Sequence, residues 1–276
     1  MVTEVSIDKI EAYAAYFPGP HAQLAHASIA AGNTAAQLWE APQTTGQTTL
    51  LLWDKGNNVL YLAGQPMSET TQRDLAQLID AQIRPHAIAA GLTFFKVRAL
   101  APAFEEVLAD LFAGIALQEL RTFFYGFERT QPPQVPAPAI ANMRLVAIDQ
   151  AFLANAELTN IEQVRAEIRW MWPSEERFCA LGLGCAAVVQ QQVICWCTAE
   201  YMSGARCGIG IETVSEYERR GVATATAAQF VQDARQRGVT PYWECRSTNI
   251  GSIRVAEKVG FTRLSEERFW TGVFRA

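Results

Sequence analysis

The residues with the clearest chemical potential lie between Cys207 and Thr224, where an apolar stretch runs through a short loop into a helix start. The first turn of a helix carries unpaired backbone N–H groups and a partial positive charge, which together bind phosphate oxygens. Gly221 lets the backbone approach a ligand closely, and Ala223 is too small to block it. The segment therefore predicts a phosphate site formed by Arg219, Arg220, Gly221, Val222, Ala223 and Thr224.

A second motif, Asn249-Ile-Gly-Ser-Ile-Arg-Val-Ala-Glu-Lys-Val-Gly-Phe261, follows about thirty residues later. Asn249 and Ser252 are both residue types that cap helix N-termini, so capping alone could explain them. The two motifs together resemble the GNAT superfamily of acetyl-CoA-dependent N-acetyltransferases, over roughly residues 143–276. That superfamily combines a Gln/Arg-x-x-Gly-x-Gly/Ala phosphate loop with a late helix of the form Asn-x-x-Ser/Ala…Glu-Lys-x-Gly-Phe.

The resemblance is strongest to the branch that includes zwittermicin-resistance acetyltransferases. The residues that carry it are Ile209–Thr213, Trp243–Cys245 and Ala256–Lys258. It implies that acetyl-CoA is a co-substrate and that Asn249 and Ser252 contact the coenzyme arm. It also implies that the strand end at Thr213 and Val214 pairs with the pantetheine and polarises the thioester carbonyl.

Three positions depart from the family pattern. Glu218 stands at the Gln/Arg position of the phosphate loop, and Arg219 stands where glycine is frequent. Ala256 replaces a tyrosine that protonates the leaving thiolate in many members. Ser252, Tyr242 or a water is then left to supply that proton, or the step is unimportant. These departures keep open a non-catalytic protein that binds acyl-CoA or serves an interaction.

A base must remove the proton of an attacking amine, because a protonated amine cannot attack. All three histidines lie in the first half, so carboxylates are the candidates in the second half. We expect Glu212 and Glu244 to lie on the strands that splay around the thioester, with Glu200 on the preceding strand. Each alone is more typical of a solvated surface, whereas together they favour a cationic acceptor. Catalytic roles are thus predicted for Glu212, Glu244 and Ser252.

The acceptor itself is less defined by the sequence. The resemblance implies a small molecule with an amine, which includes amino-sugar or peptide-like antibiotics. A longer acyl-CoA donor or a protein N-terminus as acceptor is the remaining variant of the enzyme hypothesis. Trp170, Trp172, Trp196 and Trp243 could wall an acceptor pocket, although aromatic residues at such spacing are more often core.

Composition excludes several other classes. The 276 residues carry a formal charge of -5 and are 50% hydrophobic, which argues against a nucleic-acid partner and allows two cores. Met1–Glu11 is acidic without an apolar segment, and no apolar run approaches about 20 residues. We therefore expect a cytoplasmic protein without membrane contact. Cys195-Trp-Cys197 lacks the spacing of zinc ligands, so we expect no metal and thiols that serve as small core residues.

The elements that position these residues fall on either side of one linker. Residues 131–139, with four prolines, favour an extended spacer between domains at 1–130 and 140–276. The first half predicts short helices at 7–16 and 21–32, a hairpin at 50–54 and 59–63, and helices at 69–90 and 103–113. Strands at 93–97 and 120–127 complete it.

The second half repeats this order. We expect strands at 143–148, 183–190, 193–201, 207–213, 241–245 and 269–274, with helices at 151–170, 222–237 and 249–259. Both halves end with hairpin, helix, strand, helix and strand, which predicts an α/β (α+β) fold of two GNAT-like mixed-sheet units in tandem. In the first half, Ala63–Ser68 stands at the place of the phosphate loop, and Pro66 removes an amide donor. The first unit is therefore expected to be a degenerate copy that covers the acceptor site or forms a homodimer interface.

Overall fold

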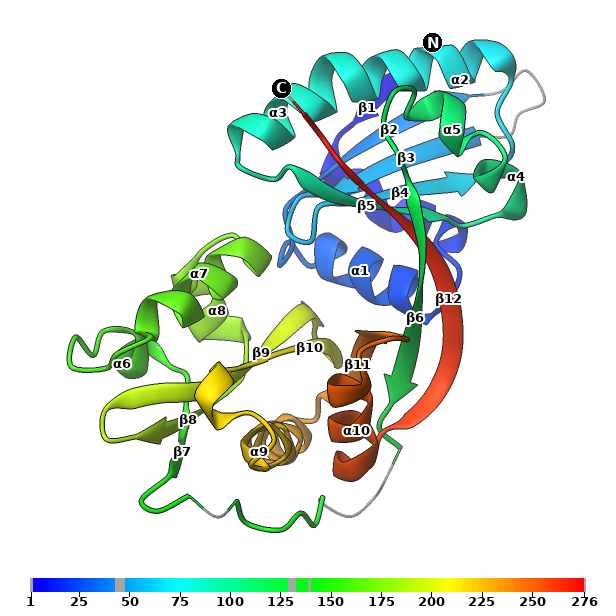
Figure 1. Cartoon of the computed structure of the whole chain (residues 1–276). Coiled ribbons are helices and arrows are strands. Elements are labelled where there is room, and N and C mark those ends of the chain that lie inside the picture. Colours follow the sequence, from blue (N-terminus) through cyan, green and yellow to red (C-terminus); the bar gives the residue numbers. More distant parts are fainter. Residues whose placement is uncertain (1, 43–47, 129–132, 139, 276) are drawn as a thin grey trace. The chain divides into compact units, whose positions relative to one another are not determined.

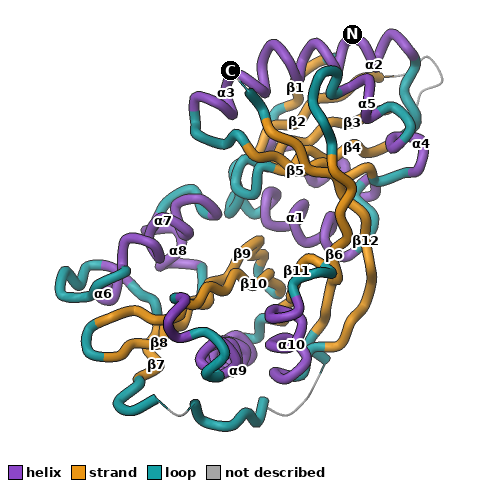
Figure 2. Tube along the Cα trace, viewed as in Figure 1, coloured by secondary structure: helices purple, strands orange, loops and turns teal. Residues whose placement is uncertain are grey.

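The computed structural model describes residues 2–42, 48–128, 133–138 and 140–275, which form two compact units. Unit 1 comprises residues 1–121 and 267–276, and unit 2 comprises residues 122–266. Each unit is a mixed β-sheet with helices on both faces, as the flanking purple coils around the orange strands show (Figures 1 and 2). The predicted α/β tandem of sheet units is confirmed.

The sheet of unit 1 has the strand order β1-β2-β3-β4-β5-β12-β6. Its strands are β1 (Thr3–Val5), β2 (Ala36–Pro42), β3 (Thr48–Asp54), β4 (Val59–Gly64), β5 (Phe94–Ala99), part of β12 (Thr262–Val273) and part of β6 (Gln118–Gly126). Its helices are η1 (Ile7–Tyr16), α1 (Pro20–Ala30), α2 (Glu69–Leu78), η2 (Ile79–Ile83), α3 (Arg84–Ala89), α4 (Pro102–Glu105) and α5 (Leu108–Leu111).

The core of unit 1 forms where α2 and η2 cover one face of this sheet. Leu75, Leu78 and Ile79 from the helices pack with Leu60 and Leu62 of β4. All five side chains are buried, because β4 alternates its residues between the two faces and the helix presents its apolar stripe to one of them. Helix α1 lies on the opposite face (Figure 1).

The sheet of unit 2 has the strand order β12-β6-β11-β10-β9-β8-β7. Its own strands are β7 (Arg144–Ala147), β8 (Gly184–Val189), β9 (Gln192–Ser203), β10 (Arg206–Thr213) and β11 (Thr240–Arg246). Its helices are α6 (Gln150–Leu153), α7 (Ile161–Met171), α8 (Glu175–Leu181), η3 (Ser215–Tyr217), α9 (Val222–Gln236) and α10 (Ile250–Val259). Helices α7 and α8 lie on one side of strands β8 to β10, and α9 lies on the other (Figure 1).

Strands β6 and β12 belong to both units. In unit 2, β6 pairs antiparallel with β11 from Tyr242↔Gly126 to Arg246↔Thr122. In unit 1, β12 pairs antiparallel with β5 from Trp270↔Val97 to Val273↔Phe94. The last strand of each half of the chain therefore completes the sheet of the other half. The compact units are bounded differently from the expected domains at 1–130 and 140–276: residues 122–128 belong to unit 2, and residues 267–275 belong to unit 1.

Several elements differ from their predicted form. The segment 7–16 is a 3-10 helix, and the predicted helix at 69–90 is interrupted by the π-helical turn η2. Strands β1 and β2 and helix α8 were not predicted, and β12 begins at Thr262 rather than 269. Residues 133–138 of the linker contain neither helix nor strand, whereas 131, 132 and 139 lie outside the described residues.

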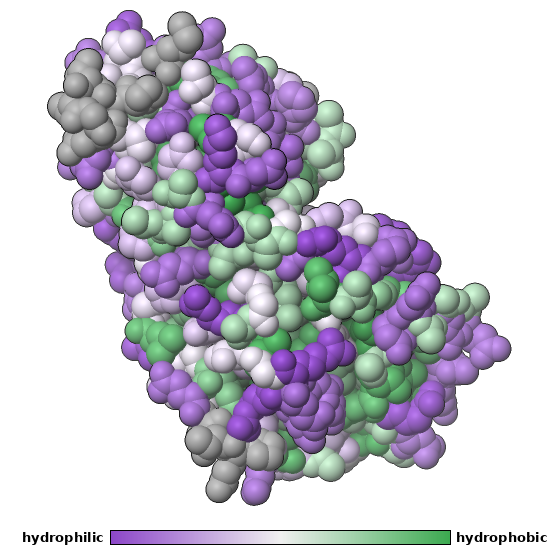
Figure 3. Space-filling view, turned by 180° about the vertical axis from the view of Figure 1, so that it is seen from behind, coloured by the Kyte–Doolittle hydropathy of each residue, from purple (hydrophilic) through white to green (hydrophobic). Residues whose placement is uncertain are grey.

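The surface and the thiols complete the description. One face of the molecule mixes hydrophilic and hydrophobic residues (Figure 3). Within the described parts of the chain, no helix is long and apolar enough to cross a bilayer.

Cys195 and Cys197 are buried, and burial raises the pKa of Cys195 to about 11. A protonated buried thiol packs as a small hydrophobic side chain.

Candidate active site

The expected phosphate-binding turn is the connection between β10 and α9. Gly221 is the N-cap of α9 with φ +82°, a left-handed conformation that favours glycine, and Val222 starts the helix. Val222 is buried among Ala187, Ile194 and Cys195, so the first turn is anchored to the sheet. Glycine offers no side chain to cap the helix, which leaves the first-turn amides for a ligand.

Charged side chains and the linker surround this turn. The guanidinium of Arg220 lies over the ring of Tyr217 at 5.6 Å, which fixes its position beside the helix start. Arg219 and Arg220 directly precede Gly221, so two consecutive cationic residues lie next to the helix start. The backbone of Arg219 is in the left-handed region, with φ +57°. Pro138 of the linker is the neighbour nearest to Gly221: a Cβ built on the glycine would lie 3.8 Å from the Cβ of Pro138. Pro138 thus lies beside the turn, at van der Waals distance from that Cβ position.

Strands β10 and β11 separate beside this turn. They are parallel neighbours, yet only Arg206↔Thr240 and Cys207↔Pro241 pair. Strand β10 continues to Thr213 and β11 to Arg246, so both strands extend well beyond the last pair. Their facing backbone groups are left available for an extended ligand. The predicted splay of the two strands is present.

The amides of β10 show which groups face this opening. Val214 donates its N–H to the carbonyl oxygen of Ile194 on β9 at 2.9 Å. Successive peptide groups of a strand alternate in direction, so the N–H groups of Thr213 and Ile211 point away from β9, toward the splay. The amide predicted for coenzyme pairing at Val214 is therefore used within the sheet, whereas that of Thr213 faces the opening.

Glu212 lies on the face of the sheet that α7 covers. It is the cross-strand partner of Trp196, and Gly210 is the partner of Thr198, so these four residues share one face. The pKa of Glu212 is raised, first by burial and then by the charges of Glu167 and Glu218. A raised pKa brings a carboxylate closer to the basicity that proton removal at neutral pH requires.

Glu167 on α7 is the residue that the sequence did not reveal. Trp196 donates its indole N–H to Oε2 at 2.6 Å, and Thr198 donates its hydroxyl to Oε1 at 2.8 Å. Burial is the main cause of the raised pKa of Glu167, and these two hydrogen bonds oppose it. Glu167 is half-buried whereas Glu212 is exposed, so the interaction joins a shielded carboxylate to an accessible one on the same face.

Gly210 makes room for this cluster. A Cβ at position 210 would overlap the Oε1 atom of Glu200 and lie 2.8 Å from the Oε1 atom of Glu167. Two carboxylates thus converge on the backbone of β10, next to Glu212. The third carboxylate predicted from the sequence, Glu200, belongs to the group, and a side chain at position 210 would displace the carboxylates of Glu200 and Glu167.

Glu244 lies on the other arm of the splay. The hydroxyl of Thr122 donates to Glu244 Oε1 at 3.0 Å and holds the carboxylate against β6. Tyr242, two residues earlier on the same face of β11, stacks on Phe124 with a centroid distance of 5.4 Å.

The late helix α10 begins as the capping interpretation expects. Asn249 Oδ1 accepts the N–H of Ser252 at 3.1 Å, and the Ser252 hydroxyl oxygen accepts the indole N–H of Trp243 at 3.0 Å. Asn249 is exposed and Ser252 is half-buried, so both remain accessible at the helix start. Ala256, at the position of the family tyrosine, is fully buried and offers no proton donor.

The four tryptophans divide between core and site. Trp172 and Trp243 are buried in unit 2, with the Trp172 indole N–H bound to the carbonyl of Ala199. Trp170 is 56% exposed on α7. Trp196 alone among them binds the carboxylate cluster, through Glu167.

These features define an α/β protein in which a splayed parallel strand pair meets an uncapped helix start, and comparisons with known proteins identify it further. The chain belongs to the GNAT acetyltransferase family, whose model matches residues 15–268. It is 32% identical over 95 residues to the uncharacterized N-acetyltransferase YdfB of Bacillus subtilis (strain 168), a match that spans 34% of this chain and 36% of that protein. The chain therefore spans only about a third of this curated relative.

Solved structures show the same fold over the whole chain. A GCN5-related N-acetyltransferase-like protein from Streptococcus suis 89/1591 superposes with a TM-score of 0.64 at 17% identity, covering 96% of this chain and 98% of its own. A tandem GNAT protein from the clavulanic acid biosynthesis pathway superposes with a TM-score of 0.56 at 14% identity, covering 100% and 99%. The second similarity agrees with two GNAT-like units in one chain.

Proposed function

We propose that unit 2 transfers an acetyl group from acetyl-CoA to the amine of a small molecule, by direct attack with both substrates bound. The observation that carries this proposal is the splay of β10 and β11 beside the uncapped start of α9. This arrangement combines free strand-edge groups with phosphate-binding amides, so it suits an extended phosphorylated ligand.

The residues that would hold acetyl-CoA follow from this placement. The amides of Gly221, Val222, Ala223 and Thr224 with Arg219 and Arg220 would bind the pyrophosphate, and Asn249 and Ser252 would contact the arm. The side chain of Val214 and the backbone of Thr213 would line the pantetheine. Acetyl-CoA supplies an activated thioester. The N–H of Thr213 would hydrogen-bond the carbonyl oxygen as negative charge develops there.

Glu212 would accept the proton of the acceptor amine, directly or through a water. Glu167 supports this role: its negative charge raises the pKa of Glu212 and thereby its basicity. The carboxylates also attract a cationic acceptor to the face opposite α9, where the amine would be desolvated and oriented. Glu244 would interact with the acceptor from the β11 side.

Proton donation to the leaving thiolate is the weakest part of the family pattern in this chain. Ala256 cannot act, so Ser252, Tyr242 or a water is assigned the donor role. This departure is the specific observation that favours a second candidate, a non-catalytic acyl-CoA-binding protein. The resemblance at Ile209–Thr213 and Trp243–Cys245 supports the proposal that this chain belongs to the zwittermicin-resistance branch. Membership of that branch would place an antibiotic-like amine among the acceptors.

The test has two stages that separate the candidates. Acetyl-CoA at a hundred times its dissociation constant should raise the free energy of unfolding by about 2.7 kcal/mol. Free thiol is then measured across a library of amines. Thiol release that depends on an amine supports the enzyme, stabilisation without thiol release supports the binding protein, and no stabilisation at millimolar acetyl-CoA contradicts both.

A further inference from the structure

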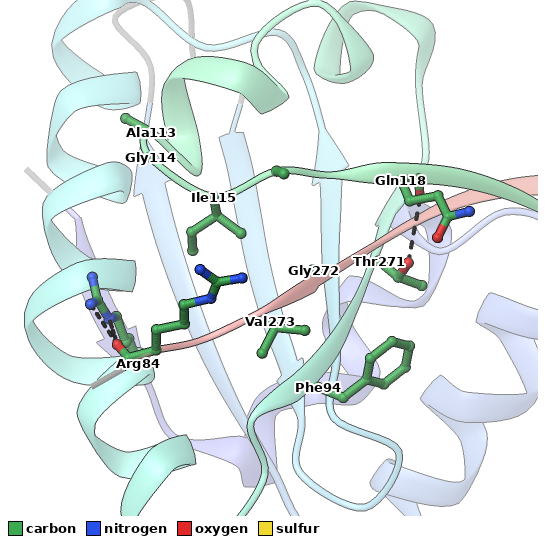
Figure 4. A pocket seen from close by; sticks show the side chains of 11 residues that line it. Arg84, Phe94, Ala113, Gly114, Ile115, Gln118, Thr271, Gly272 and Val273 are labelled. Atoms are coloured by element: carbon green, nitrogen blue, oxygen red, sulfur yellow. Dashed lines mark hydrogen bonds between the residues drawn. The ribbon is translucent and has the colours of Figure 1, made fainter.

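A cavity of about 410 Å³ opens in unit 1, and none of the residues that line it is assigned to the coenzyme or acceptor. It lies between the end of β12, the start of β5 and the loop at 113–118 (Figure 4). Its volume falls within the range of small-molecule sites, about 300–1,000 Å³. Nothing in the proposed transfer reaction uses it.

The walls of the cavity are mixed, and they include large apolar side chains that are exposed. Phe94 of β5 and Val273 of β12 are cross-strand partners, and they are 43% and 46% exposed. Ile115 of the loop also lines the cavity, and Figure 4 shows the three side chains around the same opening. Large apolar side chains at a concave site gain free energy when a ligand removes them from water.

The charged side chains that line the cavity are all cationic. Arg84 and Arg275 line it, and none of its lining residues is acidic. Arg84 is already engaged: it donates through Nη1 to Asp80 at 2.8 Å and through Nε and Nη2 to the carbonyl oxygen of Arg275 at 3.0 and 2.6 Å. Within the described residues, no carboxylate pairs with the guanidinium of Arg275.

The chain is built to hold Arg275 at this place. Phe274 is buried and stacks on Phe95 with centroids 4.1 Å apart, and its N–H donates to the carbonyl of Thr93 at 2.8 Å. Arg84 fixes the backbone of the next residue through its two hydrogen bonds to the Arg275 carbonyl. The backbone on both sides of the Arg275 side chain is thus anchored, so the strand end presents this exposed side chain at a defined place.

We propose that this cavity binds a small organic carboxylate with an apolar body. The Arg275 guanidinium presents a planar fork that matches a carboxylate, while Phe94, Ile115 and Val273 contact the apolar part. Gln118 and Thr271 supply the remaining polar lining. Among the described residues that line the cavity, Arg275 carries the one guanidinium without a carboxylate partner, which suits a monoanion better than a doubly charged phosphate that typically requires several donors.

The experiment uses octanoate and its uncharged analogue octanamide, titrated into the full chain by calorimetry. Octanoate should bind saturably at millimolar concentrations or below, and octanamide at least tenfold more weakly. Arg275→Gln should weaken octanoate at least tenfold, whereas Arg73→Gln, an exposed arginine of α2 outside the cavity, should leave it unchanged. Val273→Asp, at an exposed position, should abolish octanoate binding by placing a negative charge at the wall.

The outcomes that overturn the proposal are distinct from a failure of the transferase. Equal affinities for octanoate and octanamide, unchanged binding in Arg275→Gln, or no saturable binding would contradict it. Displacement of octanoate by inorganic phosphate at equal concentration would contradict the carboxylate class. Acetyl-CoA affinity should be the same in Arg275→Gln as in the unmodified chain, because the proposed coenzyme site lies wholly in unit 2.

Discussion

The two units differ at their parallel strand pairs, β4–β5 in unit 1 and β10–β11 in unit 2. Strands β4 and β5 pair from Val59↔Lys96 to Leu62↔Ala99, with a further hydrogen bond from Leu100 N–H to the Leu62 carbonyl. Strands β10 and β11 stop pairing after Cys207↔Pro241. A paired strand edge has no backbone groups left for a ligand, so the parallel pair of unit 1 is closed and that of unit 2 is open.

The helix starts beside these strands differ in the same sense. In unit 1, the Ser68 hydroxyl accepts the N–H of Thr71 at 3.2 Å and caps α2. Gly64 precedes it with φ +87°, and a Cβ there would overlap the carbonyl oxygen of Thr48. In unit 2, Gly221 leaves the first-turn amides of α9 uncapped. These differences support the proposal that unit 2 binds the coenzyme, whereas unit 1 is a degenerate copy of the same fold that does not bind it.

The largest effect is expected for Gly221→Asp. The side chain would place a negative charge against the phosphates and strain the left-handed N-cap, so acetyl-CoA affinity should fall at least about 100-fold, or about 2.8 kcal/mol. Calorimetry measures the affinity. Gly238→Asp is the matched control, since Gly238 has φ +72° at the other end of α9 with no neighbour near its Cβ position. Equal losses in both variants would contradict a phosphate site at Gly221.

The next effect concerns the base. Glu212→Gln should lower kcat/KM by about 10²–10⁴, the usual contribution of a general base, while acetyl-CoA affinity stays unchanged. The rate of the unmodified chain should rise with pH through the raised pKa of Glu212, because only the deprotonated carboxylate accepts a proton. Glu216→Gln in η3 serves as the control. A pH profile of Glu212→Gln with the same acidic limb would remove Glu212 from this role.

Glu167→Gln should produce a smaller and more specific change. Removing this negative charge lowers the pKa of Glu212, so the acidic limb of the rate profile should move to lower pH. The raised folded pKa of Glu167 means that its protonated form stabilises the fold below about pH 4.5, and that this stabilisation is lost as pH rises through the folded pKa. The variant should therefore show a flatter dependence of unfolding free energy on pH above 4.5. An unmoved acidic limb would show that Glu167 does not act on Glu212.

The smallest effect lies in unit 1. Ser68→Ala removes the cap of α2 and should lower the free energy of unfolding by about 1 kcal/mol, measured by denaturant unfolding. Affinity for acetyl-CoA should not change, because the uncapped α2 start lies beside closed strands. An increase in the number of bound acetyl-CoA molecules would show instead that the cap alone keeps unit 1 from binding.

The sequence predicted the elements around Gly221 well, because a strand, a glycine at a helix start and a capped late helix leave local signals. It did not predict Glu167, whose place in the site depends on α7 packing over β9, some thirty residues away in the chain. The exchange of β6 and β12 between units was invisible for the same reason: each strand has an ordinary alternating pattern, and only tertiary pairing decides its partner. The continuous pairing of β4 with β5 could not be predicted either, because it depends on the register of the two strands and not on their residue types.

The most direct test of the comparison is the stoichiometry of acetyl-CoA binding to the full chain, measured by isothermal titration calorimetry. One acetyl-CoA should bind per chain, in unit 2, and this binding should be lost in Gly221→Asp. Two bound molecules per chain, or one that persists in Gly221→Asp, would contradict the assignment of coenzyme binding to the open strand pair of unit 2.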